Sequence, residues 1–208
     1  MPLTQYPDTT VTAKPISTRV LKTSWIKNYL EYSEGQESPK VFHLWSALTM
    51  LSAAVRRNIY FDQSYFKVFP NLFVMFVSPP GRSRKGGAID VALPIITKID
   101  GLKILHEKLT PEGLIKYLLH DSIKADGKKI HTECNTFIIC KELSVLFSKS
   151  SYTAGLVELL TSLYDCPDEW DYTTSSKGKV KFQNVHITMW MASNPEWLAK
   201  SLPEDAFG

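Results

Sequence analysis

Three largely apolar runs constrain the fold of this chain more than any other feature. They are Leu72–Val77, Thr136–Cys140 and Val185–Ser193. Strands that are apolar on both faces are typical of a parallel sheet covered by helices. Helical patterns alternate with these runs, at residues 87–99, 110–119 and 152–164. The alternation predicts a three-layer α/β domain with a mostly parallel sheet over residues 70–208.

The first third of the chain follows a different pattern. Residues 1–18 are polar and rich in Pro and Thr, so we expect a flexible arm. Residues 19–69 predict a helical segment with a small β-hairpin. Its expected parts are a helix at 20–32, a helix at 41–56 capped by Ser38 and opened by Pro39, and two short strands joined at Gln63–Ser64.

Composition limits where and how the protein works. No apolar run reaches the roughly 20 residues that a membrane-spanning helix needs, and the N-terminus has no apolar signal core. The three cysteines fit a reducing compartment, so we expect a cytoplasmic protein without a membrane partner. A net charge of +3 is compatible with nucleic-acid binding but does not indicate it alone.

The first apolar run leads into the sequence SPPGRSRKGGAID, which has features of a phosphate-binding loop. Such a loop needs glycines, a helix N-terminus and a lysine. Gly81 provides the turn, Lys85 the cation, and Gly86 begins the helix. The candidate phosphate-binding residues are Pro80, Gly81, Arg82, Ser83, Arg84, Lys85, Gly86 and Gly87. Arg84 precedes Lys85 where glycine is usual, so an ordinary basic turn remains the alternative.

Lys141 and Glu142 follow the second run directly. In ATPases, an Asp at the first of these positions holds Mg²⁺ and a following Glu activates water. Lys141 occupies the position of the Asp, and Gly86 occupies that of a magnesium-binding Ser or Thr. If the two strands are neighbours, Glu142 lies beside the loop of the first run. The alternative is that Glu142 is only an acid in the first turn of a helix.

Asn194 follows the third run directly, and Pro195 comes next. A polar side chain at this place can orient water against a γ-phosphate. Asn followed by Pro is also a good helix start, with Asn as the cap. The two roles are compatible, because one residue can perform both.

Lysines at the tip of a predicted β-hairpin are the candidate nucleic-acid contacts. Lys177, Lys179 and Lys181 lie at or beside the turn, and alternate residues share one face of a strand. A solvated charged turn is the alternative. The spacing of His131, Cys134 and Cys140 matches no common zinc site, so we interpret them as buried thiols and a loop histidine.

The order of phosphate-type loop, strand-end Glu and strand-end Asn resembles that of P-loop ATPases of the AAA+ and RecA-like kind. The segments TPEGLIKYL, ELSVLF, LYDCPDEW, ASNPEWL and LPEDAFG make the resemblance more specific. They are similar to the ATPase core of helicase and primase-helicase proteins from phages, plasmids and integrated elements. The resemblance extends from Phe42 to Gly208.

This resemblance implies an ATP-hydrolysing motor domain that acts on single-stranded DNA as a ring-shaped homo-oligomer. It implies that Lys85 contacts phosphates, Glu142 activates water and Asn194 senses the γ-phosphate, with ATP and Mg²⁺ as cofactors. Gly86 and Lys141 leave the direct Mg²⁺ ligands open. No arginine follows where an arginine finger is expected, so we expect the core to be incomplete at its C-terminus. The alternatives are a nucleotide- or nucleic-acid-binding module without turnover, and a scaffold domain.

Overall fold

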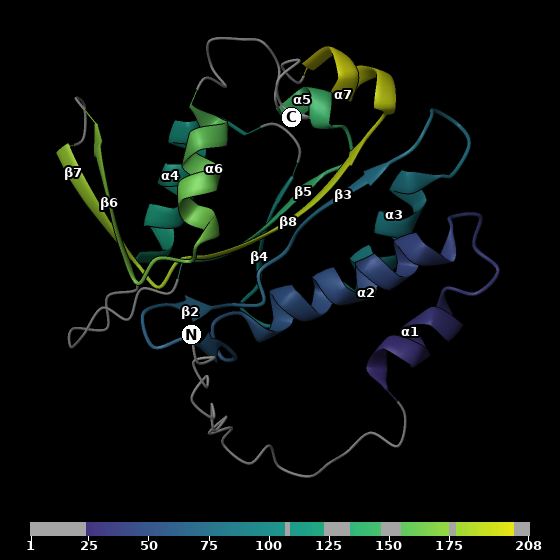
Figure 1. The fold of residues 1–208 in the computed structure, drawn as a ribbon, viewed down its shortest axis with the longest axis horizontal. Helices are drawn as coiled ribbons and strands as arrows, with labels where there is room; N and C mark the ends of the chain where they lie inside the picture. The colour runs from purple at the N-terminus through teal and green to yellow at the C-terminus, as the bar shows by residue number, and fades with distance from the viewer. Residues whose placement is uncertain (1–23, 107–108, 123–133, 147–154, 175–177, 202–208) are drawn as a thin grey trace, which may run out of the picture.

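A four-stranded parallel sheet forms the centre of the protein (Figure 1). The computed structural model describes residues 24–106, 109–122, 134–146, 155–174 and 178–201. In spatial order the strands are β3 (Phe73–Val77), β8 (His186–Ser193), β5 (Asn135–Cys140) and β4 (Lys103–His106). The predicted α/β class with a parallel sheet is therefore confirmed.

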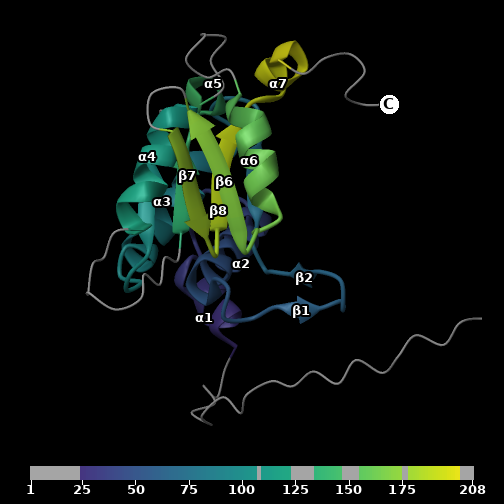
Figure 2. The same ribbon diagram turned by 90° about the vertical axis from the view of Figure 1, so that its left-hand side faces the viewer.

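Helices cover both faces of this sheet (Figure 1), and Figure 2 views the molecule from the side of α4 and α6. One face carries α1 (Trp25–Tyr32), α2 (Lys40–Val55) and α3 (Lys85–Ile96). The other face carries α4 (Pro111–Ser122), α5 (Leu143–Leu146) and α6 (Leu156–Tyr164). The chain thus leaves β3 toward one face and β5 toward the other, and such divergence opens a crevice at the carboxyl edge of a sheet.

The two central strands, β5 and β8, are buried along their whole length. Trp190 of β8 is fully buried, as its position in an apolar run predicts. Its ring meets Phe76 edge-on at 5.8 Å and lies 6.2 Å from Phe137, between centroids. These contacts join three strands on the face of the sheet that carries α2 and α3.

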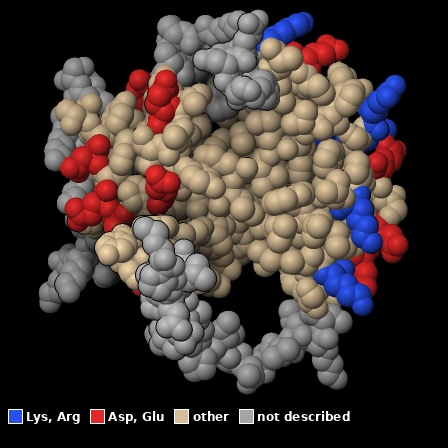
Figure 3. Space-filling model, viewed as in Figure 1, with Lys and Arg blue, Asp and Glu red and all other residues tan. Residues whose placement is uncertain are grey.

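The strand β3 differs from its prediction, because it lies at the edge of the sheet. Among the described strands only β8 pairs with it. Met75 and Val77 are 36% and 39% exposed, so the expectation of burial on both faces is wrong. Together with Val41 and Trp45 of α2, they line an apolar groove of about 440 Å³. Figure 3 shows a broad central area without charged side chains on the face seen in Figure 1.

Two antiparallel hairpins lie outside the main sheet. The predicted small hairpin forms, but its strands are only β1 (Phe61–Asp62) and β2 (Lys67–Val68). The second hairpin consists of β6 (Glu169–Thr174) and β7 (Gly178–Gln183), as the alternating pattern predicts. A final helix, α7 (Pro195–Ser201), follows β8. No helix in the described ranges is both long and apolar enough to cross a membrane.

Candidate functional site

A cavity of about 310 Å³ opens at the carboxyl edge of the sheet. It contains residues of the loop after β3 and the two residues that follow β5. Its lining is Ser78, Pro79, Gly81, Arg84, Lys85, Gly86, Lys141 and Glu142. Four of the eight predicted phosphate-binding residues and the predicted catalytic acid therefore meet in one place.

The backbone of the loop turns sharply into α3. Its first residue stays beside the sheet, because the Ser78 N–H donates to the Ser193 carbonyl at 3.3 Å. Gly81 has φ +73°, a conformation that glycine adopts without strain. Arg84 is the N-cap of α3 and has φ +41°, which is uncommon for a residue with a side chain. The helix begins at Lys85, one residue before the predicted start at Gly86.

The unusual conformation of Arg84 is held from the N-terminal segment. The Arg84 carbonyl accepts the Ser38 hydroxyl at 2.7 Å and the Gly87 N–H at 2.7 Å. A side chain at Gly87 would bring a Cβ within 3.2 Å of the Ser38 Oγ. The prediction that Ser38 caps α2 is therefore wrong. Pro39 is the N-cap of α2, and the Ser38 hydroxyl is used by the loop instead.

Three cationic side chains line the cavity, and two of them have acidic partners. The Arg84 guanidinium pairs with Glu37. The Lys141 ammonium pairs with Asp90 of α3 at 2.5 Å. Lys85 is half-buried, and the described residues offer it no ion-pair partner. Lys85 is therefore the cation with most freedom to meet an anion in the cavity.

Glu142 reaches the cavity by a different arrangement from the one predicted. The prediction rested on β3 and β5 being neighbours, but β8 lies between them. Glu142 nevertheless lines the cavity and is exposed. It stands one residue before α5 rather than in its first turn, and its carbonyl accepts the Val145 N–H at 2.9 Å. Its carboxylate is thus accessible to a water molecule or a ligand.

Asn194 lies at the same edge but not in the cavity lining. It follows Ser193, which is paired with Val77 across the β3–β8 ladder. Its Oδ1 accepts the Trp197 N–H at 2.8 Å, so the predicted cap of α7 is confirmed. The amide nitrogen is the group that this bond leaves for a ligand.

The remaining predicted residues occupy the loop or lie elsewhere. Pro80, Arg82 and Ser83 belong to the same loop and Gly87 to the first turn of α3, but none of the four lines the cavity. The Ser83 Oγ is buried and has no hydrogen-bond partner within the described ranges. The contacts that Glu37 and Ser38 make with Arg84, and that Asp90 makes with Lys141, were not predicted, because the partners are distant in sequence. A Ser before a Pro is typical of a helix start, and that local pattern concealed the contact of Ser38.

The hairpin lysines are only partly described. Lys177 lies outside the described residues. Lys179 and Lys181 belong to β7, where they pair in register with Thr173 and Asp171 of β6. Their spacing places them on one face of the strand. A role in nucleic-acid binding remains a prediction.

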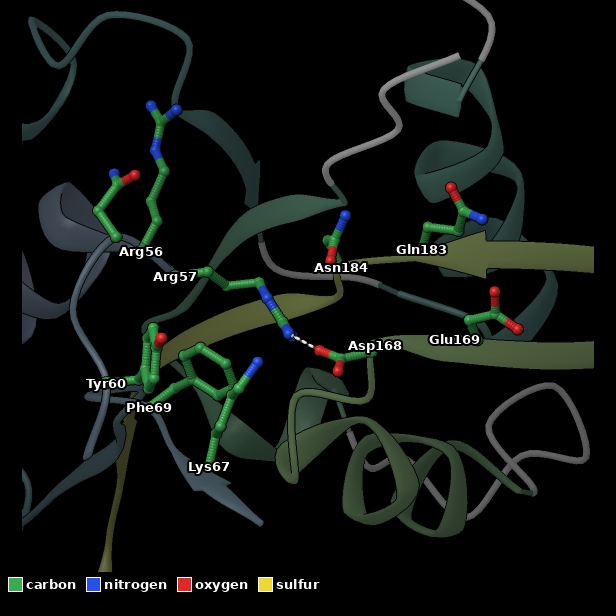
Figure 4. Close-up of a pocket in the computed structure, with 10 residues that line it drawn as sticks. Arg56, Arg57, Tyr60, Lys67, Phe69, Asp168, Glu169, Gln183 and Asn184 are labelled. Atoms are coloured by element: carbon green, nitrogen blue, oxygen red, sulfur yellow. Dashed lines mark hydrogen bonds and ion pairs between the residues drawn. The ribbon is translucent and has the colours of Figure 1, made fainter. Parts of the chain in front are cut away.

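A larger cavity, of about 510 Å³, lies at the opposite, amino edge of the sheet (Figure 4). Arg57 points into its centre, but the protein itself satisfies this cation. The Arg57 guanidinium donates to the Val185 carbonyl at 3.0 Å and to the Cys166 carbonyl, and it pairs with Asp168. Its charge is thus compensated by the fold. We favour the smaller cavity, because Lys85 and Glu142 meet there.

No protein-family model matches the chain, and no curated protein is similar enough to count as a match. The function is therefore inferred from the residues of this chain and their arrangement.

Proposed function

We propose that this chain is the ATP-binding domain of a DNA motor protein of the kind carried by phages and mobile elements. The observation that carries the proposal is the cavity in which Lys85 and Glu142 meet at the carboxyl edge of the parallel sheet. A glycine-containing loop that leads into a helix presents backbone N–H groups to an anion. The sequence resemblance to P-loop ATPases supports the same reading.

Each residue then has a role in phosphoryl transfer. The Lys85 ammonium and the loop amides neutralise the phosphates. The Glu142 carboxylate accepts a proton from water as the water oxygen attacks the γ-phosphorus and the bond to ADP breaks. The Asn194 amide nitrogen donates to the γ-phosphate or to that water. Asn194 acts from the end of β8, beside the loop.

Isothermal titration tests the binding step. Lys85→Ala is expected to weaken ATP binding at least tenfold, about 1.4 kcal/mol, because a charge-assisted contact is lost. Lys98→Ala, on the turn after α3, is the matched control and should bind as the wild type does. Unchanged affinity in Lys85→Ala would remove the nucleotide site from this cavity.

Phosphate release tests the catalytic step. Glu142→Gln is expected to bind ATP normally but to lower turnover by about 10²-fold or more, since the general base is lost. A wild-type chain that binds ATP without releasing phosphate would instead support a nucleotide-binding module without turnover. The Lys141–Asp90 ion pair favours that second candidate, because Lys141 occupies a position where ATPases carry an acid.

DNA binding is tested through its salt dependence. Each phosphate contact to single-stranded DNA contributes about 0.7 to the slope of log affinity against log salt. Changing Lys177, Lys179 and Lys181 to Ala should lower the slope by up to about 2. Equal slopes for the variant and the wild type would mean that the hairpin lysines contact solvent and not DNA.

Sedimentation of the chain with and without ATP tests the proposed homo-oligomer.

A further inference from the structure

Basic side chains dominate the cavity at the carboxyl edge of the sheet. Arg84, Lys85 and Lys141 line it, and Glu142 is the only acidic residue in the lining. Lys141 and Gly86 stand where the ATPase pattern has an acid and a hydroxyl that hold Mg²⁺. The site therefore has a different charge balance from that of a magnesium-dependent ATPase.

These residues do not fit a directly held magnesium ion. Mg²⁺ requires oxygen ligands in nearly octahedral geometry. The Glu142 carboxylate is the only anionic oxygen donor in the lining, and the Lys141 ammonium beside it repels a dication. The buried Ser83 hydroxyl is not part of the lining. Across the described ranges, no group of three or more His, Cys, Asp or Glu side chains could hold a metal ion.

We infer that Lys141 takes the place of the metal, so that this cavity binds a nucleoside triphosphate without a divalent cation. The inference rests on the proposed nucleotide site and specifies the form of its ligand. Lys85 enters from the start of α3 and Lys141 from the end of β5, so the two ammonium groups approach the cavity from separate elements. A triphosphate free of metal carries more negative charge than its magnesium complex, and it suits this basic lining better.

In the absence of ligand, the Asp90 carboxylate forms an ion pair with the Lys141 ammonium. The two side chains are 37% and 57% exposed, and ion pairs in such positions contribute little to stability. A phosphate group carries more charge and more acceptor oxygens than a carboxylate, so it can replace Asp90 as the partner of Lys141. Asp90 therefore competes with the ligand, and its removal should strengthen binding.

Titration of the whole chain with ATP, in EDTA and in Mg²⁺, tests the inference. We expect the affinity in EDTA to equal or exceed that in Mg²⁺. Lys141→Met should lower the affinity in EDTA at least about tenfold, as for loss of a charge-assisted contact, and Lys141→Arg should largely restore it. Asp90→Asn should raise the affinity by about two- to fivefold, because a competing charge is removed. Lys98→Met is the control and should change neither value.

The outcomes separate this inference from the proposed function. Binding that requires Mg²⁺, or that is unchanged in Lys141→Met, would overturn the inference and leave the nucleotide site in place. No binding in either buffer, by a chain whose circular dichroism shows it folded, would remove the nucleotide site and the inference with it. Inorganic triphosphate serves as a second probe. It should compete with ATP in EDTA, because Lys85 and Lys141 contact only phosphate.

Discussion

At the scale of single residues, the Ser38 hydroxyl is the contact that fixes the loop after β3. It donates to the carbonyl of Arg84, a residue whose positive φ is uncommon for a side chain of this size. The same hydroxyl oxygen would lie only 3.2 Å from a Cβ on Gly87, which is a tight contact. The geometry of the proposed site therefore depends on a residue outside it.

Ser38→Ala should weaken both the fold and the site. The free energy of unfolding should fall by about 1 kcal/mol, since the Arg84 carbonyl loses one of its two hydrogen bonds and keeps the one from the Gly87 N–H, and ATP affinity should fall severalfold. Urea denaturation and titration measure the two effects. Ser162→Ala removes a hydroxyl that donates within α6, to the Glu158 carbonyl at 2.9 Å, and should change stability by less than about 0.5 kcal/mol. Equal losses in both variants would mean that Ser38 has no special role.

Sequence patterns predicted residues whose partners are near in the chain. Asn194 caps α7, as predicted, and Thr110 caps α4 by the same pattern, with the Gly113 N–H donating to its Oγ1 at 3.0 Å. Both contacts span three residues, so spacing and residue type suffice to predict them. The Ser38–Arg84 and Lys141–Asp90 contacts join distant segments. Nothing local distinguishes such residues from an ordinary cap or a surface lysine.

At the scale of elements, the sequence predicted the strands β3, β5 and β8 but not their order. The apolar run that forms β3 resembles the runs that form β5 and β8, yet β3 lies at the edge. Strand order depends on which helices fill each face, and that is a property of the tertiary packing. Glu142 reaches the cavity although β8 separates its strand from β3, because all these strands end at the same edge.

Arg57 connects elements at the other edge of the sheet. It follows α2 and joins the turn before β6 to the start of β8, through the carbonyls of Cys166 and Val185 and the carboxylate of Asp168. Its side chain is only 12% exposed. Arg57→Met keeps much of the side-chain volume but removes every donor. The two carbonyls then lose their partner in a largely buried place.

Arg57→Met should therefore lower the free energy of unfolding by about 2–4 kcal/mol. Urea denaturation of the purified chain is the measurement. Lys67→Met is the control, since the Lys67 ammonium lies 5.0 Å from the Tyr60 ring centroid on a short, exposed hairpin. A change of less than 1 kcal/mol in Arg57→Met would show that the carbonyls find other partners.

At the scale of the whole molecule, two buried histidines connect stability to pH. His186 is 1% exposed at the start of β8, and burial, with the nearby charges of Arg57 and then Arg56, lowers its pKa to about 4. His43 of α2 is also buried, and burial lowers its pKa. In the folded protein both imidazoles stay neutral at pH values where an unfolded chain would protonate them.

The sign of the effect follows from proton binding. Below about pH 6.5 the unfolded chain takes up protons at these histidines while the folded chain does not, so stability is lost as pH falls toward 4. For His186 the full loss is roughly 3 kcal/mol, since each pKa unit corresponds to about 1.4 kcal/mol.

Urea denaturation at steps from pH 7.5 to 4.5 measures this loss of stability. Aspartates and glutamates also titrate in the lower part of this range, so the comparison with His186→Gln isolates the histidine. That variant should lose less stability between pH 6.5 and 4.5 than the wild type, whatever its stability at pH 7.5. Parallel profiles for the two proteins would mean that His186 is protonated equally in the folded and unfolded chains, and that the arginines beside it do not disfavour its charge.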